Sequence, residues 1–463
     1  MKRNLLLITL LCLSFGLKAQ YWSQQNTNMV GTTIGVDQVS IVDSVTVWVD
    51  GFNGSGVGGY IHALSRTHDG GTTWVPGTYS GFGATVHSAV LCGVTNSKGF
   101  CVGYDTVAQS ASYWKTIDGG ATWTTVTGVL NSSSSFADGV KFWNSHQGFC
   151  YGDPVSSYFE IYTTSDSGAT WTAVPTTNIP VASSTTEYGY NGFDCAAIVP
   201  GGIGFFLSNM GRVFKTTDYG ATWSLTATAP YTTVPNSGKI YASSANYIIT
   251  SSLTDVTNDV WSWKYTTDGG STWATFTPAS GNFYTYQMCY VPGTANLFVA
   301  ASPYSSLMGV GYSNDGGMNW TDFTDATYLQ PAGSNIQCLG VGFFNQKLGW
   351  VGNYDQATTI NSILKYSNPG GIVGLQSYSL NGNDLNIYPN PGNGKVQIAV
   401  NGPSNQDVTI RVYDLTGNLI FERILNANGV SSTSYDFSNL SKGMYIVNAS
   451  SANDQINSKL VIN

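Results

Sequence analysis

Short stretches of apolar and aromatic residues recur along the chain at intervals of about 50 residues, separated by polar, glycine-rich segments. Each stretch has the length and the β-branched and aromatic content of a buried β-strand. They lie around Trp48, Phe100, Phe149, Phe205, Ile248, Phe298 and Trp350. No long pattern of helical period follows residue 20. A regular spacing of this length predicts one unit of several strands, repeated along an all-β chain.

A polar motif, Asp-x-Gly-x-Thr-Trp, accompanies the apolar stretches about 20 residues further on. Its copies begin at Asp69, Asp118, Asp166, Asp218, Asp268 and Asp315, and the last copy has Asn in place of Thr. The Asp side chain can accept hydrogen bonds from backbone N–H groups a few residues on, and Gly supplies a positive φ. The motif therefore predicts a tight turn between two strands. Equivalent positions of a repeat cannot converge on one site, so we interpret these six carboxylates as structural.

This motif resembles the Asp box of the bacterial neuraminidase repeat, which also occurs in photosystem II assembly factors and xyloglucan-cleaving glycosidases. The resemblance implies a β-propeller in which each box joins the third and fourth strands of a blade, away from the binding face. The seventh copy, around Asn368, is degenerate and lacks Trp, whereas Tyr21-Trp22-Ser23-Gln24 opens the mature chain like a fourth strand. We therefore expect a seven-bladed β-propeller over residues 20–371, closed by its N-terminal strand.

The two ends of the chain differ from the repeats. Residues 1–19 have the basic start, apolar run and small-residue end of a secretory signal peptide. Residues 372–382 are a predicted linker. Residues 383–463 contain short apolar stretches and a turn at Asp414-Leu415-Thr416-Gly417-Asn418, which predict a small antiparallel β-sandwich.

The C-terminal segment also resembles the sorting domain of the type IX secretion system of Gram-negative bacteria. The matching pieces are Asn386 to Pro391, Val412 to Gly417, Leu440 to Tyr445 and Lys459 to Ile462. The resemblance implies that residues 383–463 interact with that secretion machinery. It also implies an extracellular or outer-surface location after removal of the signal peptide. We expect no membrane span, because the apolar run of the signal peptide is too short and no other segment could cross a bilayer.

Composition narrows the classes of partner and site. A formal net charge of −8 argues against nucleic acid and anionic membranes as partners. The six cysteines of the mature chain permit three disulfides, with Cys92 and Cys101 as the first pair to consider, or buried free thiols. The four histidines are scattered without metal-ligand spacing, so we expect neither a metal site nor a cofactor.

The box motif invites the hypothesis of a sialidase, which the arginine content contradicts. The resemblance implies that such an enzyme needs three arginines to hold the carboxylate of its substrate. The predicted propeller contains only Arg66 and Arg212, and Arg66 occupies a repeat position that Lys115 and Lys215 fill elsewhere. We therefore expect no sialidase activity.

The loops opposite the boxes carry acids and aromatic residues that suit a ligand site. We expect a binding protein for a polysaccharide or a surface protein, without evident catalysis, and name Glu187-Tyr188-Gly189-Tyr190 first. The alternative is a glycoside hydrolase that uses two carboxylates on the same face. The predicted ligand-binding residues are Asp105, Asp153, Glu187, Tyr188, Tyr190, Trp261 and Tyr354.

Overall fold

The computed structural model consists of two compact units, residues 1–369 and 370–463, which are described separately below. The predicted signal peptide and, apart from Ile372, the predicted linker lie outside the described residues. The structure describes residues 21–31, 33–54, 61–304, 306–324, 336–355, 362–369, 371–372, 385–388, 390, 392–450 and 455–463. Within the described residues, no helix is long and apolar enough to cross a bilayer.

Seven antiparallel sheets of four strands each make up the described part of the first unit. The first three sheets consist of β2 (Ile34–Ile41), β3 (Val47–Asn53), β4 (Ala63–Thr67) and β5 (Val75–Thr78); β6 (Val86–Gly93), β7 (Gly99–Asp105), β8 (Ser110–Thr116) and β9 (Thr124–Thr125); and β10 (Ala137–Phe142), β11 (Gly148–Val155), β12 (Tyr158–Thr164) and β13 (Thr172–Ala173). Two short 3-10 helices lead to the fourth sheet, η1 (Thr176–Asn178) and η2 (Phe193–Cys195).

The remaining four sheets repeat this order of strands. They consist of β14 (Ala196–Val199), β15 (Ile203–Leu207), β16 (Val213–Thr216) and β17 (Ser224–Leu225); β18 (Gly238–Ala242), β19 (Ile248–Asp255), β20 (Val260–Thr266) and β21 (Ala274–Thr275); β22 (Gln287–Tyr290), β23 (Phe298–Ser302), β24 (Gly309–Ser313) and β25 (Thr321–Asp322); and β26 (Ile336–Asn345), β27 (Leu348–Asp355), β28 (Ser362–Ser367) and β1 (Trp22–Asn26).

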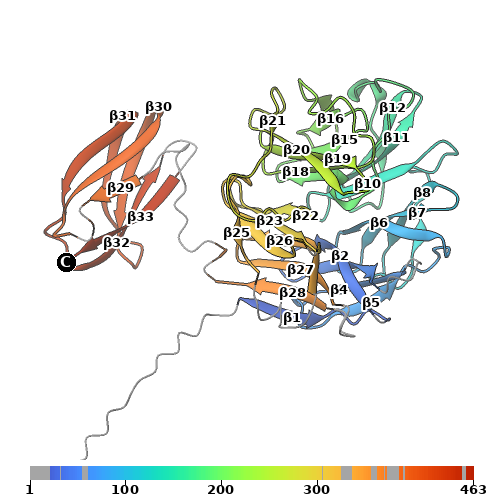
Figure 1. The fold of residues 1–463 in the computed structure, drawn as a ribbon, viewed down its shortest axis with the longest axis horizontal. Helices are drawn as coiled ribbons and strands as arrows, with labels where there is room; N and C mark the ends of the chain where they lie inside the picture. Colours follow the sequence, from blue (N-terminus) through green and yellow to red (C-terminus); the bar gives the residue numbers. More distant parts are fainter. Residues whose placement is uncertain are drawn as a thin grey trace, which may run out of the picture. The chain divides into compact units, whose positions relative to one another are not determined.

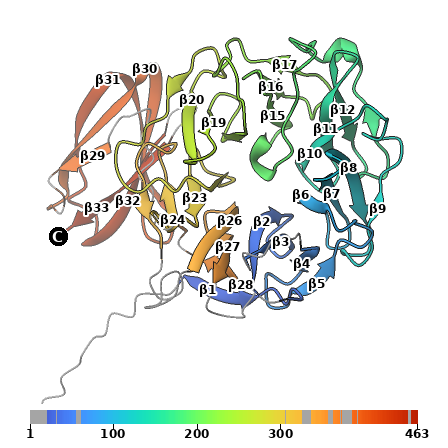
Figure 2. The same ribbon diagram turned by 45° about the vertical axis from the view of Figure 1, so that its right-hand side comes forward.

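The first strand of each sheet lies at the centre of a ring. Each first strand contacts the first strand of the next sheet, in the order β2, β6, β10, β14, β18, β22 and β26, and β26 contacts β2 to complete the ring. Figures 1 and 2 show the sheets arranged around this centre. The first unit is therefore a seven-bladed β-propeller, as predicted.

The N-terminal strand closes the ring. β1 pairs antiparallel with β28, and Trp22 lies opposite Tyr366 in the register. Trp22 is buried, with its ring centroid 5.2 Å from that of Tyr366 and 5.1 Å from that of Phe323. This pairing confirms the closure that the sequence predicts and covers the edge of β28, which would otherwise have unpaired backbone groups.

The box turns have the hydrogen bonds expected of them. In the second sheet, Asp118 Oδ1 accepts hydrogen bonds from the backbone N–H of Thr122 at 2.9 Å and from the Thr116 hydroxyl at 2.8 Å. Hydrogen bonds from the Thr122 hydroxyl and backbone lower the pKa of Asp118 to about 2. Gly119 and Gly120 have φ of 77° and 86°. In the divergent sixth copy, Asn319 Nδ2 replaces the Thr hydroxyl as donor to Asp315, at 2.7 Å.

Substitution of one box acid tests the structural interpretation. Asp118→Ala removes the acceptor for Thr122 and Thr116, so we expect a loss of about 1–2 kcal/mol and a fall of a few degrees in melting temperature. Ile117→Ala, at the adjacent position with 68% of the side chain exposed, is the control and should have no measurable effect. A loss of ligand binding without a loss of stability would contradict the structural role.

The cysteines are free thiols, which is the second of the two alternatives that the sequence leaves open. All six are reduced, and five are buried, with Cys289 partly buried. Cys92 lies opposite Phe100 and Cys101 opposite Leu91 in the register of β6 and β7. Because successive side chains of a strand point to opposite faces, the two thiols belong to separate packing layers. The cysteines therefore act as small apolar residues in the core.

The second unit is a small antiparallel β-sandwich of β29 (Leu385–Tyr388), β30 (Lys395–Tyr413), β31 (Leu419–Asp436), β32 (Gly443–Ser450) and β33 (Gln455–Ile462). The first half of β30 pairs with β29 and its second half with β32, while β31 pairs along both halves. The core contains Ile398, Val408, Ile410, Val412, Val447 and Leu460. The predicted turn is present, with Asp414 Oδ1 accepting from the Thr416 backbone at 2.9 Å.

Candidate functional site

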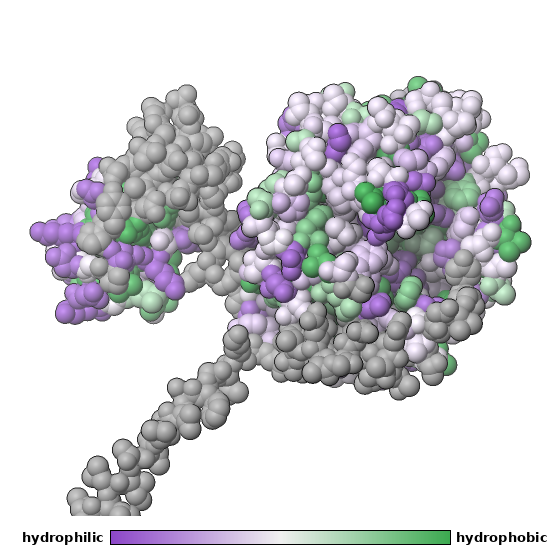
Figure 3. Space-filling view, in the orientation of Figure 1, coloured by the Kyte–Doolittle hydropathy of each residue, from purple (hydrophilic) through white to green (hydrophobic). Residues whose placement is uncertain are grey.

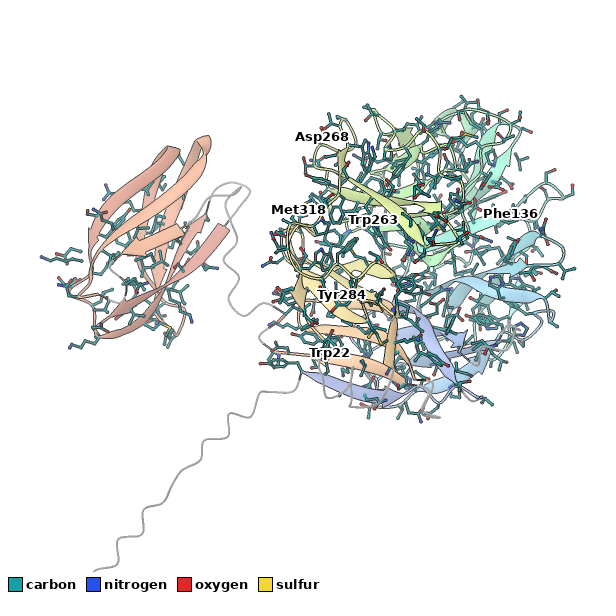
Figure 4. All side chains as sticks on the ribbon, viewed as in Figure 1. Trp22, Phe136, Trp263, Asp268, Tyr284 and Met318 are labelled. Atoms are coloured by element: carbon teal, nitrogen blue, oxygen red, sulfur yellow. The ribbon has the colours of Figure 1, made fainter. Side chains whose placement is uncertain are left out.

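The direction of the strands defines the two faces of the propeller. A box joins the third and fourth strands of a blade, so it lies on the face where the innermost, first strand ends. The innermost strands therefore begin on the opposite face. In Figure 4 the box residue Asp268 lies toward the outer edge of the ring, and Trp263 lies nearer its centre.

A cavity of about 310 Å³ lies where the innermost strands begin, and we call it the channel mouth. Its wall combines the starts of several innermost strands with η2. The lining includes Asp37, Gln38, His87, Asp194, Lys239 and Tyr286. Acids, a base and an aromatic residue from separate blades thus share one concave surface, which is typical of a ligand site.

Asp37, from β2, is held across the mouth by Tyr286, which precedes β22. The Tyr286 hydroxyl donates a hydrogen bond to Asp37 Oδ1 at 2.7 Å. Burial raises the pKa of Asp37, while this hydrogen bond and the charge of Lys239 lower it. The carboxyl group is therefore fixed in position by a residue that lies 249 positions away in the sequence.

Asp194, in η2, is the second carboxyl of the mouth. Its Oδ2 accepts a hydrogen bond from the Tyr241 hydroxyl at 2.8 Å. Burial raises the pKa of Asp194 to about 6, and the opposing influences are the charge of Lys239, the Tyr241 hydrogen bond and the charge of Lys141. A carboxyl group with this pKa changes its charge within the range of mildly acidic and neutral solutions.

Lys239 joins the acids to an aromatic rim. Burial lowers the pKa of Lys239, and its ammonium group donates to the backbone oxygen of Tyr286. Its Nζ lies 4.4 Å from the ring centroid of Trp261, a cation–π distance. Tyr304 packs edge-on against Tyr286 with centroids 5.9 Å apart. We call Trp261, Tyr286 and Tyr304 the aromatic rim.

Asp50 lies next to the mouth, in β3. Its Oδ1 accepts a hydrogen bond from the Tyr79 hydroxyl at 2.7 Å. Burial raises the pKa of Asp50 to about 7, and the nearby charge of Asp37 adds to the increase. Because the folded chain holds this proton more tightly than the unfolded chain, the contribution of Asp50 to stability declines as the pH rises from about 4 to about 7.

This pKa predicts the effect of Asp50→Asn on the pH dependence of stability. The variant should be more stable than the wild type at pH 8 and similar to it at pH 4.5, because the amide stays neutral. Melting temperatures at the two pH values provide the measurement. Asp407→Asn, at an exposed position of the second unit, is the control. Identical declines toward pH 8 in the wild type and in Asp50→Asn would contradict the assignment.

None of the predicted ligand-binding residues lines the channel mouth itself, and Trp261 lies beside it, with its ring against the ammonium group of Lys239. Tyr188 is 38% exposed and packs edge-on against Tyr190, with ring centroids 5.5 Å apart. The Tyr190 hydroxyl donates to the backbone oxygen of Val234. Tyr354 is buried and its hydroxyl donates to Gly54 O. Asp105 Oδ1 accepts from the backbone of Val107 at 2.9 Å, as a turn acid does.

The two remaining predicted acids have structural partners. The Glu187 side chain is fully covered and forms an ion pair with Arg212 at 2.6 Å. It also accepts hydrogen bonds from the hydroxyls of Ser183 and Ser208. Asp153 accepts a hydrogen bond from the Gly189 backbone at 2.8 Å, and burial raises its pKa to about 6. We therefore assign Glu187 to the framework of the loop and not to ligand contact.

Sequence reasoning missed Asp37 and Lys239 because they belong to strands and not to loops. A signal does exist in the repeat. Asp37 and Lys239 each lie in or near the first half of an innermost strand, about 30 residues before the box of their blade. His87 and Tyr286 have the same spacing from their boxes. Aligning the repeats at this position would have placed these side chains around one ring.

Among the described residues, no group of three or more His, Cys, Asp and Glu side chains could hold a metal ion. The two arginines of the propeller are engaged in the fold. Arg66 Nε donates to Gly119 O in the next blade at 2.9 Å, and Arg212 pairs with Glu187.

Comparison with known families decides the role of the second unit. Residues 386–463 match the secretion system C-terminal sorting domain. The second unit is a sorting domain. This sorting domain marks the protein for export by the type IX secretion system, to the cell surface or the surrounding medium. No curated protein matches the chain.

Several solved structures are similar to the chain. YCF48 bound to D1 peptide is 18% identical, with a TM-score of 0.48 over 76% of this chain and 98% of that one. An ancestral GH74 enzyme is 14% identical, with a TM-score of 0.47 over 96% of this chain and 64% of that one. The NanB sialidase from Streptococcus pneumoniae is 11% identical, with a TM-score of 0.38 over 74% of this chain and 70% of that one.

Proposed function

We propose that this exported propeller binds a polysaccharide at the channel mouth, without cleaving it, and acts at the cell surface or in the medium. The proposal is supported by one observation: polar side chains line the cavity directly beside the aromatic rim. Asp37, Asp194 and Lys239 supply acceptors and a donor in the cavity. Trp261 and Tyr286 lie against the ammonium group of Lys239.

This combination matches the chemistry of a sugar chain. Hydroxyl groups can donate to the carboxyls and accept from the ammonium group, while the flat apolar face of a sugar ring covers an aromatic ring. A buried polar wall that loses water must regain hydrogen bonds from its ligand, and a polyhydroxylated ligand supplies many of them. On the face seen in Figure 3, the described residues show only small, separate hydrophobic areas.

A glycan array with the mature chain, followed by titration of the best ligand, tests this function. We expect Trp261→Ala to weaken binding about tenfold to hundredfold, because a central aromatic contact often contributes 2 kcal/mol or more. Ile117→Ala, in a box turn, should bind as the wild type does. The proposal fails if the wild type binds no glycan on the array, or if Trp261→Ala binds with unchanged affinity. Binding of a surface protein in place of a glycan would support the alternative class of ligand.

The second candidate function is glycoside hydrolysis, and the pKa of Asp194 favours it. A carboxyl group that holds its proton to about pH 6 can act as a general acid, and Asp37 provides a second carboxyl in the same cavity. An assay for new reducing ends on the bound glycan distinguishes the two functions. Cleavage by the wild type that disappears in Asp194→Asn would favour the hydrolase, whereas binding without cleavage would favour the binding protein.

A further inference from the structure

A second cavity lies at the other end of the central channel, on the face of the box turns. Its volume is about 360 Å³, and six of the seven innermost strands contribute to it by their final residues. The wall is mainly apolar and includes the partly buried side chains of Ile41, Phe142, Phe193, Ile198, Tyr290 and Phe344. We call it the apolar cavity.

Large apolar side chains that stay partly exposed within a concave wall indicate a place for an apolar ligand. Such wall residues would gain free energy if a ligand displaced water from them. The volume lies within the range of small-molecule sites, which are lined mostly by apolar and aromatic residues with few polar groups. Strands of six sheets form the wall of the cavity.

The lining contains two charged residues, Asp194 and Lys141, and Asp194 marks the inner end of the cavity, next to the channel mouth. Asp194 and Phe193 line both this cavity and the channel mouth, so η2 separates the two. Lys141, the other charged residue of the lining, donates from Nζ to the Phe193 backbone oxygen at 2.7 Å. Its ammonium group also lies 4.1 Å from the centroid of the Phe193 ring. The inner end thus offers an ammonium donor and a carboxylate acceptor from neighbouring residues.

A donor and an acceptor together select a neutral hydroxyl group over a charged one. A hydroxyl can accept from Lys141 and donate to Asp194 at the same time. A ligand carboxylate would be attracted by Lys141 and repelled by Asp194, and a ligand ammonium would be attracted by Asp194 and repelled by Lys141, so neither charge gains a net electrostatic advantage. Either charged group would also lose hydration on entering an apolar wall.

We propose that the apolar cavity binds a small apolar molecule that ends in a neutral hydroxyl group, with the hydroxyl at Lys141 and Asp194. This site opens at the opposite end of the channel from the proposed polysaccharide site and shares Phe193 and Asp194 with it. The two binding activities are measured with different ligands, so a failure of one leaves the other testable.

Calorimetric titration with 1-octanol, octanoate and octylamine tests the proposal on the mature full chain. We expect 1-octanol to bind below about 1 mM and at least tenfold more tightly than either charged analogue. Ile198→Trp should fill the cavity and weaken 1-octanol binding at least tenfold. Ile117→Ala, at an exposed position of a box turn, should leave it unchanged.

A second variant keeps the test independent of the folding of Ile198→Trp. Lys141→Met keeps the wall apolar and removes the donor, so the preference should move from 1-octanol toward octylamine by at least threefold. Equal binding of the three probes, absence of 1-octanol binding, or equal loss of binding in Ile117→Ala would each overturn the proposal.

Discussion

Deletion of β1 (Trp22–Asn26) is expected to open the propeller and to lower its melting temperature by about 10 °C or more. The deletion removes a buried tryptophan, whose loss alone typically costs about 3–5 kcal/mol, together with the whole ladder to β28. It also removes Gln25, whose Oε1 accepts hydrogen bonds from Trp74 in the first blade and Trp350 in the seventh. Thermal denaturation followed by tryptophan fluorescence measures the effect.

The deletion exposes the edge of β28, so binding of an added peptide strand to this edge provides a second measurement. An edge strand with unpaired backbone groups accepts a strand from another chain. A synthetic peptide of residues 21–27 should therefore restore much of the lost stability and should suppress aggregation. Trp223→Ala, which removes an equally buried tryptophan at the start of a fourth strand, is the control and should not respond to the peptide. Unchanged stability after the deletion would contradict the closure.

Arg212→Ala is expected to destabilise the propeller by about 3–5 kcal/mol. The substitution leaves the carboxylate of Glu187 without its charged partner in a place where its side chain is fully covered. Arg212 also donates to Val181 O at 3.1 Å, so the connection between the third and fourth blades loses a second contact. Denaturant unfolding of the wild type and the variant measures the change.

Two further variants separate the buried charge from the lost packing. Arg212→Met with Glu187→Gln removes both charges and should recover much of the stability, because no buried charge remains. Arg411→Ala breaks the partly exposed ion pair with Glu422 in the second unit and should cost less than about 1 kcal/mol. A similar small cost for Arg212→Ala would show that Glu187 is not buried in solution.

The fold could be predicted from the sequence because its signals are local and repeated. Each box specifies a turn through contacts within five residues, as Asp118 and Thr122 show, and the spacing of the boxes counts the blades. The closure was predictable because the seventh blade lacks a tryptophan that Trp22 supplies. The state of the cysteines stayed open because strand register, which sequence spacing does not reveal, places Cys92 and Cys101 on opposite faces.

Most residues of the proposed site at the channel mouth were not predicted from the sequence. Loop composition pointed to Glu187, but folding brings Arg212 against it and covers both. Asp37 of the first blade and Tyr286 of the sixth are joined by a hydrogen bond although they are far apart in the sequence. Such a contact depends on the circular arrangement of blades, which becomes visible only when the innermost strands are placed around one axis.

Amide hydrogen exchange with the tightest-binding glycan tests most directly whether the channel mouth receives the ligand. Bound glycan should slow exchange at residues 237–241 and 286–290, where the innermost strands β18 and β22 begin, and leave the box turn at residues 118–123 unchanged. Protection confined to the box turns or to the outer strands would contradict the account.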